Sequence, residues 1–314
     1  MEDIRIMDSG NIGFVMLCAA FVFFMTPGLS CFYGGLVRRK NAVNTMFTSV
    51  VTIATGIVMW MLIGYSLSFG PDHGGVIGDF SWFGLEGVSL TEPYVEGQGI
   101  PNMVFCLFQM MFAVITPALI TGSVAGRMKF KSLFVFLVLW SLVVYYPMAH
   151  MVWADGGFLA KIGSVDFAGG NVVHISSGIT ALTLCILLGK RYDYKRANYK
   201  IHNTPMVALG AFILLFGWFG FNAGSALAAD GLAAHAFVTT AVSSAAAMLS
   251  WMFCDVVVNK KPTFVGACTG MVAGLVGITP GAGFVPIWAA LIIGLTTLSL
   301  IHISEPTRRV VISY

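Results

Sequence analysis

The sequence has few charged residues for its length. Asp, Glu, Lys and Arg make up 10% of its 314 residues, whereas soluble globular domains contain roughly 25%. Hydrophobic residues make up 57%, so the chain cannot cover a water-exposed surface, and a soluble globular protein and a disordered chain are both excluded. The net charge of +3 is too small to indicate a nucleic-acid partner. The composition predicts a membrane protein.

Patterns that hold disulfides or metals are also missing. The six cysteines lie in apolar stretches at irregular spacings, without a Cys-x-x-Cys motif, so we interpret them as small packing residues. No cluster of carboxylates indicates a site for a divalent metal. The sequence therefore predicts neither a metal ion nor another cofactor.

Nine stretches are long and apolar enough to cross a bilayer, which takes about 20 residues of helix. This pattern predicts an all-α fold class, a polytopic membrane helical bundle. In the eighth stretch, Gly266, Gly270 and Gly274 recur every fourth residue and allow a neighbouring helix to approach closely. The stretches are 12–36, 43–69, 102–125, 132–153, 170–189, 205–226, 233–257, 263–280 and 284–302.

The charges between these stretches fall on alternate sides. Fifteen of the 17 Lys and Arg residues lie in every second connection, and only Arg5 and Lys161 lie elsewhere. Eleven of the 14 acidic residues lie on the opposite side. Because cytoplasmic loops are rich in Lys and Arg, we expect a multi-pass protein of the cell membrane with its N-terminus outside.

Two ionisable residues near the fifth stretch need an explanation. Placing such a group in a bilayer core costs on the order of 2.5–3.5 kcal/mol of insertion free energy. His174 lies among apolar residues. It either joins helices through a hydrogen bond or passes protons without a standing charge. Asp166 precedes the same stretch, and capping of a helix start explains it better than direct contact with a ligand.

Aromatic residues gather near the same end of the predicted bundle. Phe108 and Phe112 lie one helical turn apart in the third stretch. Trp153 ends the fourth stretch, and Phe221 lies in the sixth, shortly before Ser225. One interpretation is a belt at the membrane interface. The other is a site for a monovalent cation, in which a ring face contributes about 2 kcal/mol or more when desolvated and Ser225 accepts a hydrogen bond. The residues alone leave both open.

Five segments resemble the ammonium transporter (Amt/Mep/Rh) family. The resemblance runs from Thr26 to about Gly294 and implies an eleven-span fold with ten spans in two inverted halves, of which about nine spans are present here. It implies a homotrimer with one pore per subunit, transport of ammonium or ammonia across membrane lipids, and no enzyme activity. It also allows a cytoplasmic regulator of the PII type. The segments are Phe108–Phe112, Ala149–Trp153, Asp166–His174, Trp218–Ser225 and Gly277–Pro280.

The resemblance implies a role for each candidate residue along one path. An intact ammonium ion would meet a cost of tens of kcal/mol in an apolar pore, so we expect the proton to be separated while ammonia crosses. The resemblance implies that Phe112, Trp153 and Ser225 recruit the cation, with Phe108 and the Ala168 carbonyl beside them. Phe112 and Phe221 would form a gate of stacked rings, and Asp166 would shape the vestibule. His174 would relay the proton as the first of two hydrogen-bonded histidines.

Two other functions remain as alternatives, and a third is disfavoured. An ammonium sensor with a transporter-like membrane domain and an Rh-type channel for neutral gas both fit the resemblance. An intramembrane enzyme that uses His174 and Asp166 as a dyad is disfavoured, because eight residues of helix separate the two by roughly 12 Å. No candidate nucleophile accompanies them.

The end of the sequence departs from the family. The second family histidine lies in a tenth span, and no such segment follows the ninth stretch here. The polar end of the chain is also unlike the family. We therefore expect a C-terminally incomplete transporter domain at 1–298 and a non-native tail at 299–314, and we do not assign His302 as the missing histidine.

Overall fold

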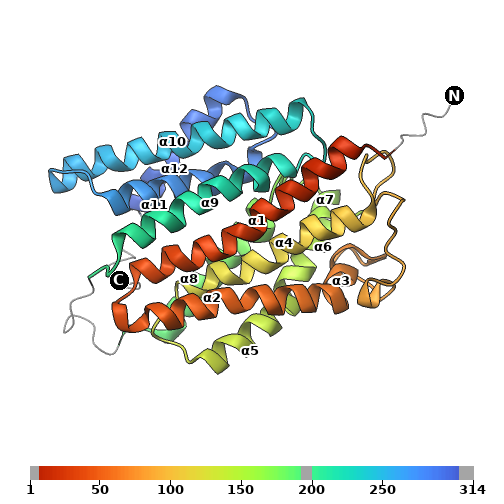
Figure 1. The fold of residues 1–314 in the computed structure, drawn as a ribbon, viewed down its shortest axis with the longest axis horizontal. Helices are drawn as coiled ribbons and strands as arrows, with labels where there is room; N and C mark the ends of the chain where they lie inside the picture. Colours follow the sequence, from red (N-terminus) through yellow and green to blue (C-terminus); the bar gives the residue numbers. More distant parts are fainter. Residues whose placement is uncertain (1–6, 192–199, 304–314) are drawn as a thin grey trace.

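The computed structural model describes residues 7–191 and 200–303, which fold mostly into helices. In Figure 1 the long helices lie side by side, and their connections gather at the two ends of the bundle. The predicted all-α, polytopic membrane bundle is confirmed. The helices are α1 (Ser9–Leu36), α2 (Arg39–Met59), α3 (Tyr65–Phe69), α4 (Asn102–Thr121), α5 (Phe130–Trp140), α6 (Tyr146–Trp153), α7 (Phe158–Lys161), α8 (Ser176–Leu188), α9 (Thr204–Gly224), α10 (Gly231–Asn259), α11 (Phe264–Ile278) and α12 (Ile287–Ile303).

Short elements interrupt or join these helices. One π-helical turn joins α2 to α3, a second joins α5 to α6, and a third leads into α8. Two short strands pair antiparallel in the segment between α3 and α4. The π-helical turns are Trp60–Gly64, Ser141–Tyr145 and Gly170–Ile175, the strands are β1 (Asp72–His73) and β2 (Ile77–Gly78), and 3₁₀ turns lie at Phe83–Leu85 and Thr279–Gly281.

Eight helical stretches of the described residues are long and apolar enough to cross a membrane. They coincide with the first eight stretches that the sequence predicts. The ninth predicted stretch, 284–302, contains α12, which has 17 residues. That length is at the short end of the range of about 17–25 residues for a membrane-spanning helix. The bundle therefore has eight long spans and one shorter apolar helix where the sequence predicted nine spans.

Capping side chains fix where several helices begin. Each accepts a hydrogen bond from a backbone N–H in the first turn, which the helix itself leaves without a partner. Pro27 and Pro117 lie inside α1 and α4 and end neither helix. The capping residues are Asp8 for α1, Asn203 for α9, Asp230 for α10 and Thr263 for α11.

Glycines let helices pack closely in two places. A Cβ atom on Gly210 of α9 would overlap the backbone nitrogen of Phe32 in α1, and one on Gly217 would overlap Met25. In α11, a Cβ atom on Gly270 would lie 2.7 Å from the Cβ of Trp251 in α10. Only a residue without a side chain permits these approaches. The close packing predicted for the glycines of the eighth stretch is thus confirmed.

The segment between α3 and α4 folds against the bundle through its aromatic rings. Tyr65 stacks on Trp82 with ring centroids 5.3 Å apart, and Tyr94 stacks on Phe105 at 4.7 Å. The segment lies at the end of the bundle where α1 begins (Figure 1), and the backbone N–H of Asp8 donates to the Gly99 carbonyl. We refer to this end as the outer end, since the sequence places its acidic connections outside.

Candidate functional site

Asp166 organises the start of the fifth span. Its two carboxylate oxygens accept four backbone N–H groups, from Gly169 and Gly170 at 2.7 and 2.6 Å and from Asn171 and Val172 at 2.7 and 3.2 Å. Gly169 adopts φ 114°, a conformation that favours glycine, and this turn lets the four N–H groups converge. The capping predicted for Asp166 is confirmed by these hydrogen bonds. Because backbone N–H groups engage both carboxylate oxygens, Asp166 contributes to the site by fixing the conformation of this backbone segment.

Trp153 meets this segment from the last position of α6. Its indole Nε1–H donates to the Asp166 carbonyl at 3.0 Å, which fixes the ring plane. The Trp153 ring lies edge-on to Phe112 of α4, with centroids 6.0 Å apart and planes at 85°. Phe112 in turn contacts Phe108 one helical turn before it, at 4.9 Å and 70°. Edge-to-face pairs of this kind are favourable ring geometries.

Phe112 and Phe221 of α9 form the next contact. Their ring centroids lie 4.3 Å apart and their planes are inclined at 41°. The family resemblance implied stacked rings, so the contact is present but the parallel arrangement is not. Each ring is 1% exposed. Phe112 thus lies between Trp153 and Phe221 in the series of ring contacts, and we use the name ring gate for Phe112 and Phe221.

His174 lies beyond the ring gate, in the π-helical turn before α8. Its imidazole lies almost parallel to Phe221, at 5.8 Å and 14°, and close to Trp218, at 5.3 Å and 28°. Trp218 is held in turn, because its Nε1–H donates to the Thr279 hydroxyl at 2.9 Å. The Nε2 atom of His174 is buried and has no hydrogen-bond partner among the described residues. A polar atom in that position is available to a small molecule or a proton.

Ser225 and Ala168 join the site through the backbone. The Ser225 hydroxyl donates to the Phe221 carbonyl at 2.9 Å, which ties it to the ring gate. Ala168 is buried within the segment that Asp166 holds. The structure thus brings Phe108, Phe112, Trp153, Phe221 and His174 into one series of ring contacts.

Two residues of the site were not assigned a role from the sequence. Trp218 stood in the aromatic run of the sixth stretch, and Thr279 in the Gly-Ile-Thr-Pro segment of the eighth. Their contact joins α9 to the end of α11. Nothing in the local pattern of either segment could pair them, because 61 residues separate them.

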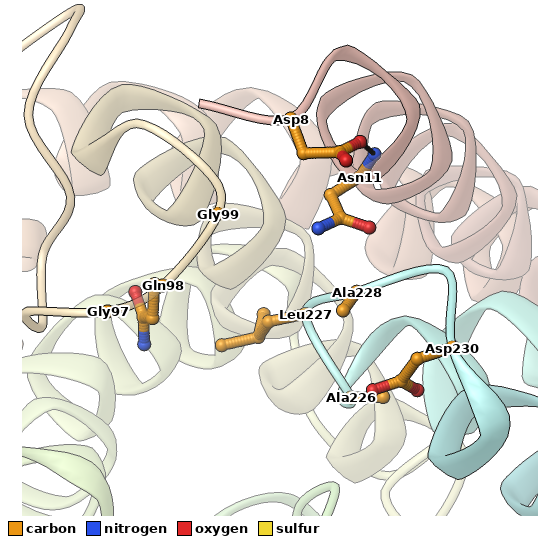
Figure 2. Close-up of a pocket in the computed structure, with 9 residues that line it drawn as sticks. All are labelled: Asp8, Asn11, Gly97, Gln98, Gly99, Ala226, Leu227, Ala228 and Asp230. Atoms are coloured by element: carbon orange, nitrogen blue, oxygen red, sulfur yellow. Dashed lines mark hydrogen bonds between the residues drawn. The ribbon is translucent and has the colours of Figure 1, made fainter. Parts of the chain in front are cut away.

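A pocket opens at the outer end next to this site (Figure 2). One of the segments that line the pocket, 226–228, directly follows Ser225, and its residue Leu227 adopts φ 58°. Asp8 and Asp230 each use one carboxylate oxygen to cap a helix. Nothing in the sequence indicated this pocket, because residues from distant parts of the chain form it. The lining residues are Asp8, Asn11, Gly97, Gln98, Gly99, Ala226, Leu227, Ala228 and Asp230.

Comparison with known proteins decides what this arrangement belongs to. The model of the Ammonium Transporter Family matches residues 13–310. The ammonium transporter of Bacillus subtilis is 47% identical over 289 residues, which cover 92% of this chain and 70% of that protein. The chain belongs to the ammonium transporter family. The resemblance identified from the sequence is thereby confirmed, and ammonium transport by a multi-pass membrane protein is the function that this membership supports.

Further relatives of this ammonium transporter agree with the assignment. Ammonium transporter Amt1 of Archaeoglobus fulgidus is 43% identical over 289 residues, covering 92% of this chain and 71% of that protein. The crystal structure of Saccharomyces cerevisiae Mep2 superimposes with a TM-score of 0.88 at 38% identity, over 98% of this chain and 70% of Mep2. A solved structure described as a sensor Amt protein gives a TM-score of 0.88 at 29% identity, over 98% of this chain and 76% of that protein.

Proposed function

We propose that this transporter takes ammonium at the outer end, removes its proton near the ring gate and lets ammonia pass. The observation that carries the proposal is the series of ring contacts from Phe108 through Phe112 and Phe221 to His174. One end of this series offers ring faces to a cation. The other end offers a buried nitrogen without a partner.

We assign recruitment to Phe112 and Trp153, which contact each other, and to Ser225, which is bonded to the backbone of Phe221. The ring faces of Phe112 and Trp153 attract a desolvated cation, with about 2 kcal/mol or more from a good contact. Trp153 is held for this role because its N–H is already engaged by the Asp166 carbonyl. Ser225 donates its own hydrogen to Phe221, so its oxygen lone pairs accept an N–H of ammonium. Phe108 and the Ala168 carbonyl complete the surroundings of the cation.

The ring gate separates the charged form from the neutral form. The Phe112 and Phe221 rings touch, so they must rotate to let a molecule through, and a small uncharged one needs less space than a hydrated ion. Removing ammonium from water into this apolar interior would cost far more than moving ammonia. Ammonium therefore releases a proton and becomes ammonia, and the proton moves through His174, whose Nε2 lies beyond the gate without a hydrogen-bond partner among the described residues. Asp166 maintains the vestibule above it.

The recruitment step is tested by replacing Trp153. Trp153→Leu should raise the KM for methylammonium uptake into proteoliposomes about tenfold, the change that a lost contact of roughly 1.4 kcal/mol produces. Trp288→Leu is the matched control, because this tryptophan of α12 is 68% exposed and lies outside the series of ring contacts. An unchanged KM in Trp153→Leu contradicts the proposed recruitment site.

We also propose the orientation and the partners. The N-terminus lies outside, which the basic connections at the opposite end support. The assembly is a homotrimer and its regulator is a cytoplasmic protein of the PII type, both of which the family resemblance supports. Accessibility of a single cysteine placed near Asp8 tests the orientation, since labelling of intact cells by an impermeant reagent requires an outer N-terminus.

An ammonium sensor is the second candidate, because the solved sensor Amt protein shares this fold at 29% identity. A sensor of this kind binds ammonium at the outer site and carries no current. An Rh-type channel for neutral gas takes up ammonia, also without current. Recording current and uptake on the same preparation separates these two functions from proton-coupled transport.

A further inference from the structure

His150 lies in α6 and is completely buried. Its Nδ1 lies 3.1 Å from the carbonyl oxygen of Ser68, and its Nε2 lies 3.0 Å from Oδ1 of Asp72. A carbonyl and a carboxylate both accept hydrogen bonds and donate none. A neutral imidazole carries one N–H and one lone pair, so it would direct a lone pair at one of these acceptors. Only the doubly protonated ring, an imidazolium, satisfies both contacts.

Asp72 supplies the opposite charge that a buried imidazolium requires. The hydrogen bond from His150 lowers the pKa of Asp72 below its ordinary value of 3.8, and the Gly75 backbone N–H and Lys161 act in the same direction. The Gly75 N–H donates to Oδ1 at 2.6 Å, and the Lys161 ammonium lies 3.8 Å from Oδ2. Asp72 therefore stays ionised at neutral and mildly acidic pH, and its side chain is 27% exposed.

The pair links segments that converge on the outer site. Ser68 belongs to α3 and Asp72 to β1, so His150 joins both to α6. A second link lies close by, because the Phe158 N–H at the start of α7 donates to the Gly75 carbonyl at 2.7 Å. The end of α6 is held between these links, and Trp153 occupies that end, about one turn beyond His150.

We infer that His150 is a positioning residue, held as an imidazolium between Ser68 and Asp72, which fixes the end of α6 and with it Trp153. The part that concerns Trp153 rests on the proposed recruitment role of that residue. With only one ring proton, one of the two hydrogen bonds would become a contact between a lone pair and an acceptor.

The charged groups next to the ring agree with an imidazolium. Asp72 contacts the ring and favours its charged form, and Lys161 lies on the far carboxylate oxygen of Asp72.

Nitrogen-15 NMR of histidine-labelled full-length chain in lipid nanodiscs tests the charge state directly. His150→Gln assigns the signals. We expect both ring nitrogens of His150 to carry hydrogen in the unmodified chain. In Asp72→Asn the side-chain amide can donate to the ring, so one ring nitrogen should carry no hydrogen. Amide hydrogen exchange across 150–158 should be faster in His150→Gln than in the unmodified chain.

His73→Gln is the matched control, because His73 is the exposed neighbour of Asp72 in the same strand, and it should change neither readout. A singly protonated His150 ring in the unmodified chain at neutral pH overturns the inference. Asp72→Asn keeps the test decisive if His150→Gln does not fold.

The positioning role has its own readout in uptake. The KM for methylammonium should rise several-fold in His150→Gln, whose amide cannot join both acceptors, and stay level in His73→Gln. An unchanged KM in His150→Gln overturns the positioning role. If no form takes up methylammonium, the proposed function fails, whereas NMR and exchange still decide the charge state of His150.

Discussion

Asp166 shows what one side chain does for this site. Its position before the fifth span made a helix cap predictable from the sequence, and the structure confirms a cap. The number of N–H groups that it holds could not be predicted, because it depends on the left-handed conformation of Gly169 and on the π-helical turn that follows. These features bring four donors to one carboxylate. Because the Asp166 carboxylate is held in this way, the carbonyl of the same residue, which accepts the hydrogen bond from Trp153, stays in place.

Replacing Asp166 by Asn should loosen this start of the span. The amide has one acceptor oxygen, and its NH₂ group would face backbone N–H groups, so we expect a loss of about 1–3 kcal/mol in the free energy of unfolding. Thermal unfolding in detergent, followed by circular dichroism, measures the loss. Asp155→Asn changes an exposed carboxylate nearby and should have little effect. Equal stability of the two variants would show that the four hydrogen bonds contribute nothing.

At the scale of whole elements, hydropathy predicted most of the fold. The first eight predicted stretches lie on the eight long helices, because about 20 apolar residues have no other stable state in a bilayer. The π-helical turns were not predicted, since an extra residue in a turn leaves no trace in composition. One of these turns carries His174. The helix faces that meet were also not predictable, except where regularly spaced glycines in α11 marked one.

The contact of α1 with α9 gives a prediction for an element. Gly210→Ala places a methyl group against the Phe32 backbone, which cannot rotate away, so we expect a cost of about 1–3 kcal/mol and a lower melting temperature. Gly178→Ala in α8 is the control, because a Cβ atom there meets nothing within 4 Å. The melting temperatures of both variants in one detergent provide the comparison. A Gly210→Ala protein as stable as Gly178→Ala would contradict the close packing.

For the whole molecule, the motifs carried more information than the physics of single residues. They identified the family, and they singled out Phe108, Phe112, Trp153, Phe221 and His174, whose rings the structure brings into one series of contacts. Composition left an aromatic belt and a cation site equally open, and only tertiary contacts distinguish a series of rings from a belt. The tilt of the ring gate and the outer pocket required three-dimensional placement of segments far apart in sequence. The predicted tail at 299–314 falls mostly on residues 304–314, outside the described residues, and stays a prediction.

In the proposed mechanism, ammonium gives up its proton at a hydrophobic gate and His174 carries the proton. The most direct test records current from the chain in proteoliposomes on addition of ammonium or of potassium, for the unmodified chain and for His174→Asp. We predict current with ammonium alone in the unmodified chain, since potassium has no proton to release. His174→Asp should admit potassium, because a carboxylate stabilises an intact cation in the pore. Continued exclusion of potassium by His174→Asp, or ammonium uptake without current, would contradict the account.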